Sequence, residues 1–195
     1  MNELNPLFLF LNKFMDLGPD EFEEYIQPYV VLRRFEAREV VSPAGVVENY
    51  FNFLLSGLAR MYYNKSGEER VIQIAKEGHI IHAQESFHSR NPSNYCIETI
   101  EPCRFASITY NGLEMIYAAN SRMQHLGRLI ITFTMLLKEK MRIHTATASS
   151  RERFLQFVEK YPDLMQRVPQ KHLASYLSIK PETFSRFKHM LKQAQ

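Results

Sequence analysis

Residues 170–191 read QKHLASYLSIKPETFSRFKHML, and this stretch is the most informative part of the chain. Leu173, Ala174 and Leu177 give a helix over 170–177 one apolar face. A three-residue turn, 178–180, follows, and Ile179 within it is placed to fill the core between two helices. Pro181 suits the first position of a second helix, because the missing N–H costs nothing there.

The second helix, predicted over 181–192, separates apolar from polar side chains. Phe184, Phe187 and Leu191 recur at i, i+3 and i+7 and therefore face inward. This arrangement is typical of a helix-turn-helix, whose second helix enters the major groove of DNA. The side chains left facing outward are predicted to contact DNA, together with one lysine of the first helix: Lys171, Glu182, Thr183, Ser185, Arg186, Lys188 and His189.

The outward side chains suit two kinds of DNA contact. Arg186 can donate two parallel hydrogen bonds to guanine, and Glu182 can accept one from cytosine. Lys171, Thr183, Ser185 and Lys188 are candidates for phosphate contacts. Charge is consistent with this, since residues 1–120 carry 10 Lys and Arg against 16 Asp and Glu, whereas residues 121–195 carry 14 against 5. A basic C-terminal part favours a polyanionic partner, although a merely solvated basic face is the alternative.

Residues 29–110 follow a different sequence pattern. Short apolar runs alternate there with turn residues, at 43–45, 56–57, 64–67 and 77–78. Short strands at roughly 8–12-residue spacing are typical of a β-sandwich or roll. We predict eight strands, at 29–35, 39–41, 50–55, 58–63, 70–75, 80–83, 95–100 and 104–109.

A proline-free segment, 121–144, is apolar almost all round a helix. Such a helix is about 36 Å long, which is more than a small domain covers, so we expect a partner chain to bury one side. A helix buried within one monomer is the alternative. The 4-3-4 spacing predicts a homodimer interface of Leu126, Ile130, Phe133 and Leu137. Residues 145–150 are small and polar, which predicts a hinge before a further helix at 151–160.

Three stretches carry a family resemblance: PETFSR at 181–186, YFNFLLSGLAR at 50–60 and GEERV at 67–71. From about Phe22 to Leu191 the chain resembles the Crp–Fnr family, named for the cyclic-AMP receptor protein and the fumarate and nitrate reduction regulator. The resemblance implies an α+β protein with an N-terminal double-stranded β-roll like the cyclic-nucleotide-binding jelly roll, a long dimerisation helix and a C-terminal winged-helix-type helix-turn-helix. We accordingly predict a sensor domain at 1–120, a dimerisation helix and hinge at 121–145, and a DNA-binding domain at 146–195.

The resemblance also implies that Glu182, Arg186 and His189 read bases or phosphates in double-stranded DNA. RNA polymerase and a small-molecule effector of unknown identity are further candidate partners. Two departures from the family matter. Pro181 stands where the family often has Arg, and the chain ends at Gln195, so we expect the β-hairpin wing after the recognition helix to be missing.

The family's cyclic-AMP pocket needs a Gly-Glu pair for the ribose and an Arg-Ser/Thr-Ala triplet for the phosphate. Counted from Glu77-Gly78, the pair falls on His82 and Ala83. The triplet falls on Ser93, Asn94 and Tyr95, with Arg90 nearby at the wrong spacing. A buried phosphate without its arginine costs several kcal/mol. We therefore predict a degenerate pocket that does not bind cyclic AMP in the usual way.

Other function classes find little support. No run of 18 apolar residues exists, and no basic region precedes the apolar N-terminus, so we expect a cytoplasmic protein without membrane contact. His79, His82, Glu85 and His88 suggest a cupin-type metal site, but His79 and His82 are three apart and would face opposite sides of a strand. We expect no metal, no other cofactor and no catalysis. A cupin-like metal-binding protein and a ligand- or protein-interaction module that no longer reads DNA remain the alternatives.

Overall fold

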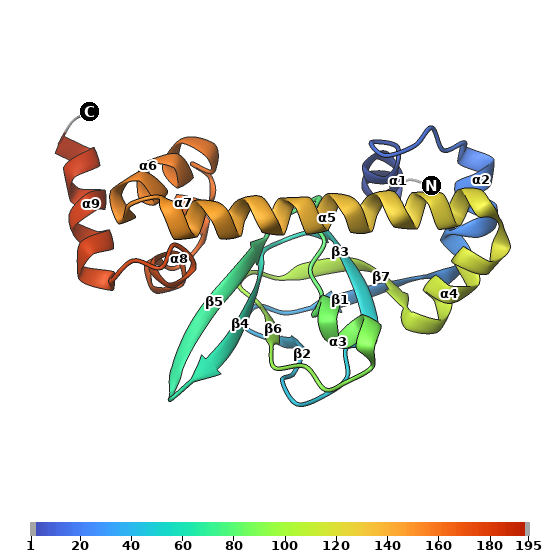
Figure 1. Cartoon of the computed structure of the whole chain (residues 1–195), viewed down its shortest axis with the longest axis horizontal. Coiled ribbons are helices and arrows are strands. Elements are labelled where there is room, and N and C mark those ends of the chain that lie inside the picture. The colour runs from blue at the N-terminus through green and yellow to red at the C-terminus, as the bar shows by residue number, and fades with distance from the viewer. Residues whose placement is uncertain (1–2, 194–195) are drawn as a thin grey trace.

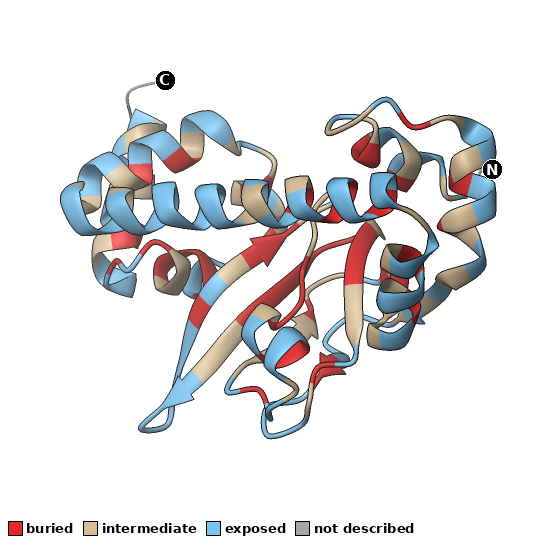
Figure 2. Ribbon diagram, turned by 45° about the vertical axis from the view of Figure 1, so that its right-hand side comes forward, coloured by how far each residue is buried: buried red, intermediate tan, exposed pale blue. Residues whose placement is uncertain are grey.

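The computed structural model describes residues 3–193. A long helix, α5 (Ser121–Thr147), runs across the top of a β-roll, with one group of helices at each of its ends (Figure 1). The chain is thus mixed helix and sheet, as the sequence predicts. Buried residues concentrate along the strands, whereas the outer face of α5 is exposed (Figure 2).

The β-roll consists of two antiparallel sheets that enclose an apolar core. Leu54, Ile97 and Phe105 are fully buried within that core. The three-stranded sheet has the order β1 (Val30–Phe35), β7 (Cys103–Thr109), β3 (Tyr50–Ser56). The four-stranded sheet has the order β2 (Val40–Ser42), β6 (Cys96–Thr99), β4 (Ala59–Lys65), β5 (Glu68–Ala75).

The turn between β3 and β4 depends on Gly57. Its φ is 95°, and a Cβ built there would lie 2.2 Å from the carbonyl oxygen of Pro102. Only glycine combines this left-handed conformation with so close a backbone approach. The turn then positions Leu58 for the contacts with the C-terminal helices that are described below.

The helices at the N-terminal end cover the three-stranded sheet. They are α1 (Asn5–Leu11), α2 (Pro19–Tyr25), the 3-10 turn η1 (Gln27–Tyr29) and α4 (Tyr110–Ala119). Two side-chain caps start the helices that follow the roll, because Thr109 accepts from the N–H of Gly112 at 3.0 Å and Asn120 accepts from the N–H of Met123 at 3.1 Å. The first half of α5 then buries Met123, Leu126, Gly127 and Ile130.

The C-terminal end consists of α6 (Ser150–Lys160), α7 (Leu164–Arg167), α8 (Gln170–Tyr176) and α9 (Pro181–Gln193). Phe154, Leu173 and Phe184 form the centre of their core. The same core includes three residues of the roll, Leu58, Val71 and Ile74. The roll and the C-terminal helices therefore share one apolar core.

The structure differs from the predicted elements at four places. Residues 80–83 form no strand; only Ile80 makes a bridge, to Phe53. Two helices were not predicted, α7 and α3 (Gln84–Ser89). The predicted hinge at 145–150 is mostly helical, because α5 continues to Thr147 and α6 begins at Ser150. None of the described helices is long and apolar enough to cross a membrane.

Candidate functional site

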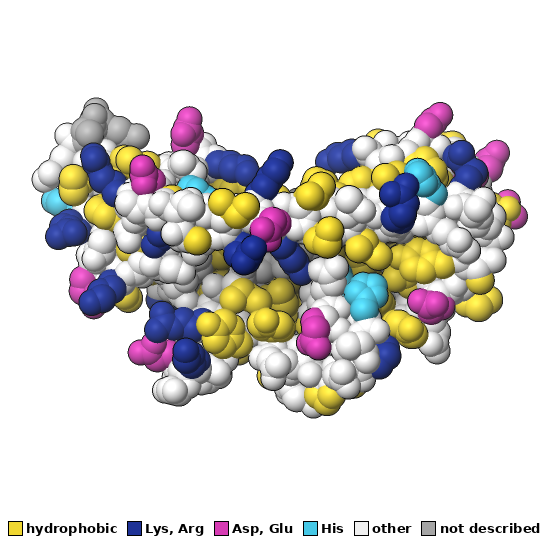
Figure 3. All heavy atoms as spheres, in the orientation of Figure 1, with side chains coloured by type: hydrophobic (Ala, Val, Ile, Leu, Met, Phe, Trp, Pro, Cys, Tyr) yellow, Lys and Arg dark blue, Asp and Glu magenta, His cyan; other side chains and the backbone are white. Residues whose placement is uncertain are grey.

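Helix α9 carries six of the seven predicted DNA-contacting residues, and the seventh, Lys171, lies on α8. Phe184 packs edge-on against Phe154, with 5.1 Å between the ring centroids. Of the seven predicted residues, five are exposed: Lys171, Glu182, Ser185, Arg186 and His189. Thr183 and Lys188 are half-buried. Lys and Arg side chains are scattered over this end of the molecule (Figure 3).

The turn between α8 and α9 is held by Arg153 of α6. Its guanidinium donates to the carbonyl oxygen of Leu177 at 2.8 Å and to that of Ser178 at 3.0 Å. It also donates to the carbonyl of Ala148, between α5 and α6, at 2.5 Å. Ser178 has a φ of 54°, and Ile179 is buried beside it. Arg153 thus connects the end of α5 to the start of α9.

Helix α8 is docked on β5 of the roll. Ser175 accepts from the N–H of Val71 at 2.9 Å through its hydroxyl and donates to the carbonyl of Glu69 at 3.2 Å. Arg60 of β4 lies 3.2 Å from Nδ1 of His172 and forms an ion pair with Glu69. Burial, followed by the charge of Arg60, lowers the pKa of His172 to about 4.

A second set of ion pairs ties α7 to the roll. Arg167 forms ion pairs with Glu77 at 2.9 Å and with Glu101 at 2.6 Å. Lys76 pairs with Asp163 at 2.8 Å, just before α7. The orientation of α8 and α9 relative to the roll is therefore held by polar contacts as well as by the shared core.

The predicted interface stripe of α5 divides into two parts. Leu126 and Ile130 are buried against the chain's own helices and roll, so they are not available to a partner in this conformation. Phe133 and Leu137 are 45% and 44% exposed. Further large apolar side chains are exposed along the second half of the helix: Met135, Leu136, Met141 and Ile143.

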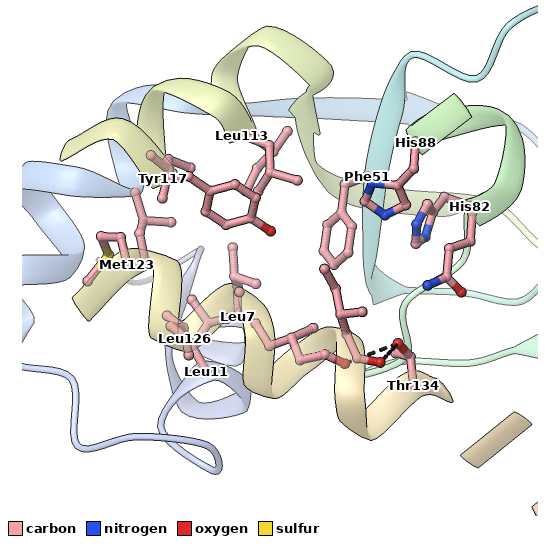
Figure 4. A pocket seen from close by; sticks show the side chains of 17 residues that line it. Leu7, Leu11, Phe51, His82, His88, Leu113, Tyr117, Met123, Leu126 and Thr134 are labelled. Carbon is pink, nitrogen blue, oxygen red and sulfur yellow. Dashed lines mark hydrogen bonds between the residues drawn. The ribbon is translucent and has the colours of Figure 1, made fainter. Parts of the chain in front are cut away.

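A small cavity of about 50 Å³ lies where α1, α4 and α5 meet the roll (Figure 4). Its walls are mainly apolar, but His82 and His88 lie at one end. His82 is buried, and its Nε2 atom has no hydrogen-bond partner within residues 3–193. Among the described residues, no group of three or more His, Cys, Asp or Glu side chains could hold a metal ion.

Comparisons with known proteins agree with this architecture. Residues 32–120 match the family model of the cyclic nucleotide-binding domain. The regulator CLP of Xanthomonas campestris, described as c-di-GMP responsive, superposes with a TM-score of 0.69 at 15% identity, covering 90% of this chain and 92% of its own. FixK2 from Bradyrhizobium japonicum gives a TM-score of 0.66 at 15% identity, with 85% of each chain covered. The Thermus thermophilus catabolite activator protein gives 0.59 at 15% identity, covering 95% of this chain and 87% of its own.

Residues 32–120 thus match a cyclic nucleotide-binding domain, and the chain resembles these solved structures in its fold. The likeness to the solved structures is one of fold, and no curated protein matches the sequence significantly. Of these neighbours, CLP is described as a global regulator and the Thermus protein as a catabolite activator protein.

Two of the positions predicted to form the degenerate cyclic-nucleotide pocket, Ala83 and Ser93, are engaged in contacts within the chain. Ala83 is buried in the roll core, and the Ser93 hydroxyl is bonded to the backbone of Tyr95. Asn94 is exposed. Arg90 donates to the carbonyls of Glu48 and Phe87 and to Asn49, and its guanidinium stacks 4.3 Å from the centroid of the Tyr110 ring.

Several residues that organise these sites were not predicted from the sequence. Arg153 bonds to Leu177, 24 positions away, and Arg60 contacts His172, 112 positions away. Lys138 of α5 donates to the side chain of Gln84, which lines the cavity and lies 54 positions away. Only a spatial arrangement brings such partners together. The inward residues of α8 and α9 were predictable, because their spacing along one helix reveals them.

Proposed function

We propose that the chain is a DNA-binding transcription regulator that acts as a homodimer, without catalytic activity. In this proposal residues 1–120 form a sensor domain, α5 is the dimerisation helix, and the part from α6 onward binds DNA through a helix-turn-helix. Helix α9 enters the major groove. Arg186 and Glu182 contact bases there, while Lys171, Thr183, Ser185, Lys188 and His189 contact phosphates or base edges.

The observation that carries this proposal is the exposed polar face of α9 behind a turn held by Arg153. A helix that reads DNA must present its side chains at a fixed angle, so a turn whose carbonyls are held by a guanidinium suits the role. The basic residues on this part of the chain supply the attraction for phosphates.

The interface proposed for the homodimer is the exposed second half of α5. Phe133 and Leu137 belong to it, and Leu136 and Ile143 extend it. Leu126 and Ile130 support it from within the chain. Two α9 helices related by a twofold axis would enter successive major grooves about 34 Å apart on a roughly palindromic site.

The test is selection of binding sites from random-sequence duplex DNA, followed by titration of the selected site and of scrambled DNA at several salt concentrations. We expect a roughly palindromic site, bound more tightly than scrambled DNA, with affinity that falls as salt rises. Failure to bind either DNA at low salt would refute the proposal and favour an interaction module that no longer reads DNA.

A further inference from the structure

The cavity between the roll and α1, α4 and α5 has two chemically different ends (Figure 4). One end is apolar, lined by Leu7, Leu11, Leu113, Met123 and Leu126. The other end carries His82 and His88 beside Phe51, with Gln84 and Thr134 at its edge. The hydroxyl of Tyr117 points into the space between the two ends (Figure 4).

His82 is the unusual group in this site. It is only 6% exposed, and its ring lies 4.9 Å from that of Phe51 and 5.4 Å from that of Phe87, between ring centroids. Its buried Nε2 atom has no partner among the described residues. Buried polar atoms are almost always hydrogen-bonded, so an unpaired nitrogen beside a cavity indicates that something else completes the bond.

The histidine end is also basic. The charged or titratable groups that influence the pKa of His82 are His88 and Lys138, and both disfavour protonation of its ring. Lys138 of α5 lies at this end, because its amino group donates to the side-chain oxygen of Gln84 at 2.6 Å. Within the described chain the acidic group that acts on His88 is Glu114 of α4, and none acts on His82. An anion placed here would meet a donor and a positive charge.

We propose that this cavity binds a short-chain monocarboxylate, with the carboxylate between His82 and Lys138 and the alkyl tail along the apolar wall. A neutral His82 with its proton on Nε2 donates to one carboxylate oxygen, and the ammonium of Lys138 pairs with the carboxylate. Leu7, Leu113 and Met123 contact the tail.

The size of the cavity limits the length of the ligand's tail, and the position of the Tyr117 ring determines that size. The space of about 50 Å³ is a third of the cavity of about 150 Å³ that holds benzene, so a tail of roughly four to six carbons fits only when the Tyr117 ring moves. Tyr117 lines both this cavity and an open groove on the outer side of α4 and α5. Its ring packs so closely on Gly127 that a Cβ there would lie 2.3 Å from Cε1. Rotation of this ring away from α5 enlarges the cavity and connects it to the groove.

The test is calorimetric titration of the full chain with hexanoate and with its neutral analogue hexanamide. We expect hexanoate to bind about tenfold more tightly, because a charge-assisted hydrogen bond is stronger than a neutral one. Lys138→Met should remove this preference and leave hexanamide binding unchanged. Lys140→Met, two residues along the same helix and exposed, is the matched control that should keep the preference.

A second readout is the imidazole resonance of His82 in NMR spectra. Burial, together with Lys138 and His88, lowers the pKa of His82 to about 3, and a bound carboxylate should raise that pKa. Equal affinity for the two probes, no hexanoate binding, or an unchanged preference in Lys138→Met would overturn the proposal. The assay contains no DNA, so its failure leaves the proposed DNA binding untouched.

Discussion

Arg186 is exposed one turn into α9, where its two parallel donors suit the O6 and N7 atoms of guanine. We expect Arg186→Ala to cost about 1–3 kcal/mol on a selected site and to flatten the preference at one base pair per half-site. Scrambled DNA should be affected little. If Arg186→Ala weakened binding to selected and scrambled DNA equally in a titration, Arg186 would contact a phosphate rather than a base.

Lys188 of α9 and Lys171 of α8 are expected to contact phosphates rather than bases. Replacing either with Ala should weaken binding to selected and scrambled DNA alike, because fewer counterions are released from the phosphates. The slope of log affinity against log salt should fall by roughly one unit per monomer. Lys65, exposed at the end of β4, is the matched control, and Lys65→Ala should leave affinity and slope unchanged.

The hydrogen bonds of Arg90 lead us to expect that the chain does not bind cyclic AMP tightly. Its guanidinium already donates to the carbonyl of Glu48 at 2.9 Å, to that of Phe87 at 3.0 Å and to the side chain of Asn49. A phosphate would have to replace these bonds, and a buried phosphate without a cation is costly. Calorimetry should therefore detect no binding of cyclic AMP below about millimolar concentration. A micromolar dissociation constant for cyclic AMP would contradict this prediction and would show that Arg90 gives up its hydrogen bonds to the two carbonyls.

Spacing along one helix predicted that Phe184 faces inward and Arg186 outward, because both follow from helical periodicity. It did not predict the bonds from Arg153 to Leu177, since a guanidinium has no preferred partner along the sequence. The DNA-contacting roles of the outward residues stay predictions.

The second half of helix α5 leaves several large apolar side chains exposed. Phe133 is 45% exposed and Leu136 is 54% exposed. We expect Phe133→Glu and Leu136→Glu each to split the proposed dimer, because each would bury an unpaired charge. Sedimentation velocity is the measurement. Gln124→Glu, on an exposed part of the same helix, is the control that should keep the dimer. A wild-type chain that sediments as a monomer at micromolar concentration would contradict this prediction.

The variant Leu136→Glu distinguishes disruption of the dimer interface from disruption of the monomer's own fold. Phe133 also packs against Phe14 of its own chain, with 5.2 Å between the ring centroids, so its replacement alters the monomer as well. Leu136 is the more exposed of the two positions. Dissociation in both variants, with an unchanged melting temperature in Leu136→Glu, would assign the effect to the interface.

The contact between α4 and α5 depends on Gly127. In most helices Gly→Ala is stabilising by about 1 kcal/mol. Here the new methyl group would overlap the ring of Tyr117, so we expect Gly127→Ala to destabilise the fold by about 1–3 kcal/mol. Adding Tyr117→Ala should make the effect of Gly127→Ala favourable, which a double-mutant cycle in urea would measure.

Most elements could be predicted from periodicity, including seven of the eight strands, and the exceptions have physical reasons. Residues 80–83 begin with two β-branched isoleucines, as a strand often does, but Ile81 and Ala83 are buried in the core as part of a loop. Helix α3 is short and carries Ser86 and His88 among its six residues, so no periodic stripe reveals it. The hinge residues continue α5, because small polar side chains tolerate a helix as well as a loop.

The stability of the whole molecule should depend on pH through His172. Its pKa is about 4 when folded, owing to burial and then Arg60, against about 6.5 in an unfolded chain. Between these values the unfolded chain binds more protons, so stability is fully present above about pH 6.5 and is lost as pH falls toward 4. The loss from this group alone has an upper limit of about 3 kcal/mol.

Urea denaturation at a series of pH values would measure this dependence. His82 contributes with the same sign, because its pKa is also lowered, to about 3. His172→Gln should therefore make the decline between pH 6.5 and 4 shallower without removing it. His125→Gln replaces an exposed histidine of α5 and should leave the decline unchanged. An identical slope in His172→Gln would contradict the assignment.

The core shared by the roll and the C-terminal helices has a consequence during synthesis. Val71 and Ile74 leave the ribosome long before Phe154 and Phe184, which cover them in the finished chain. At about 5–20 residues per second, the roughly 80 residues between Val71 and Phe154 take several seconds to make. Throughout that time the nascent roll carries an uncovered apolar patch on its edge strand β5. The newborn chain is therefore most exposed to aggregation, and to binding by chaperones, just before its last helices emerge.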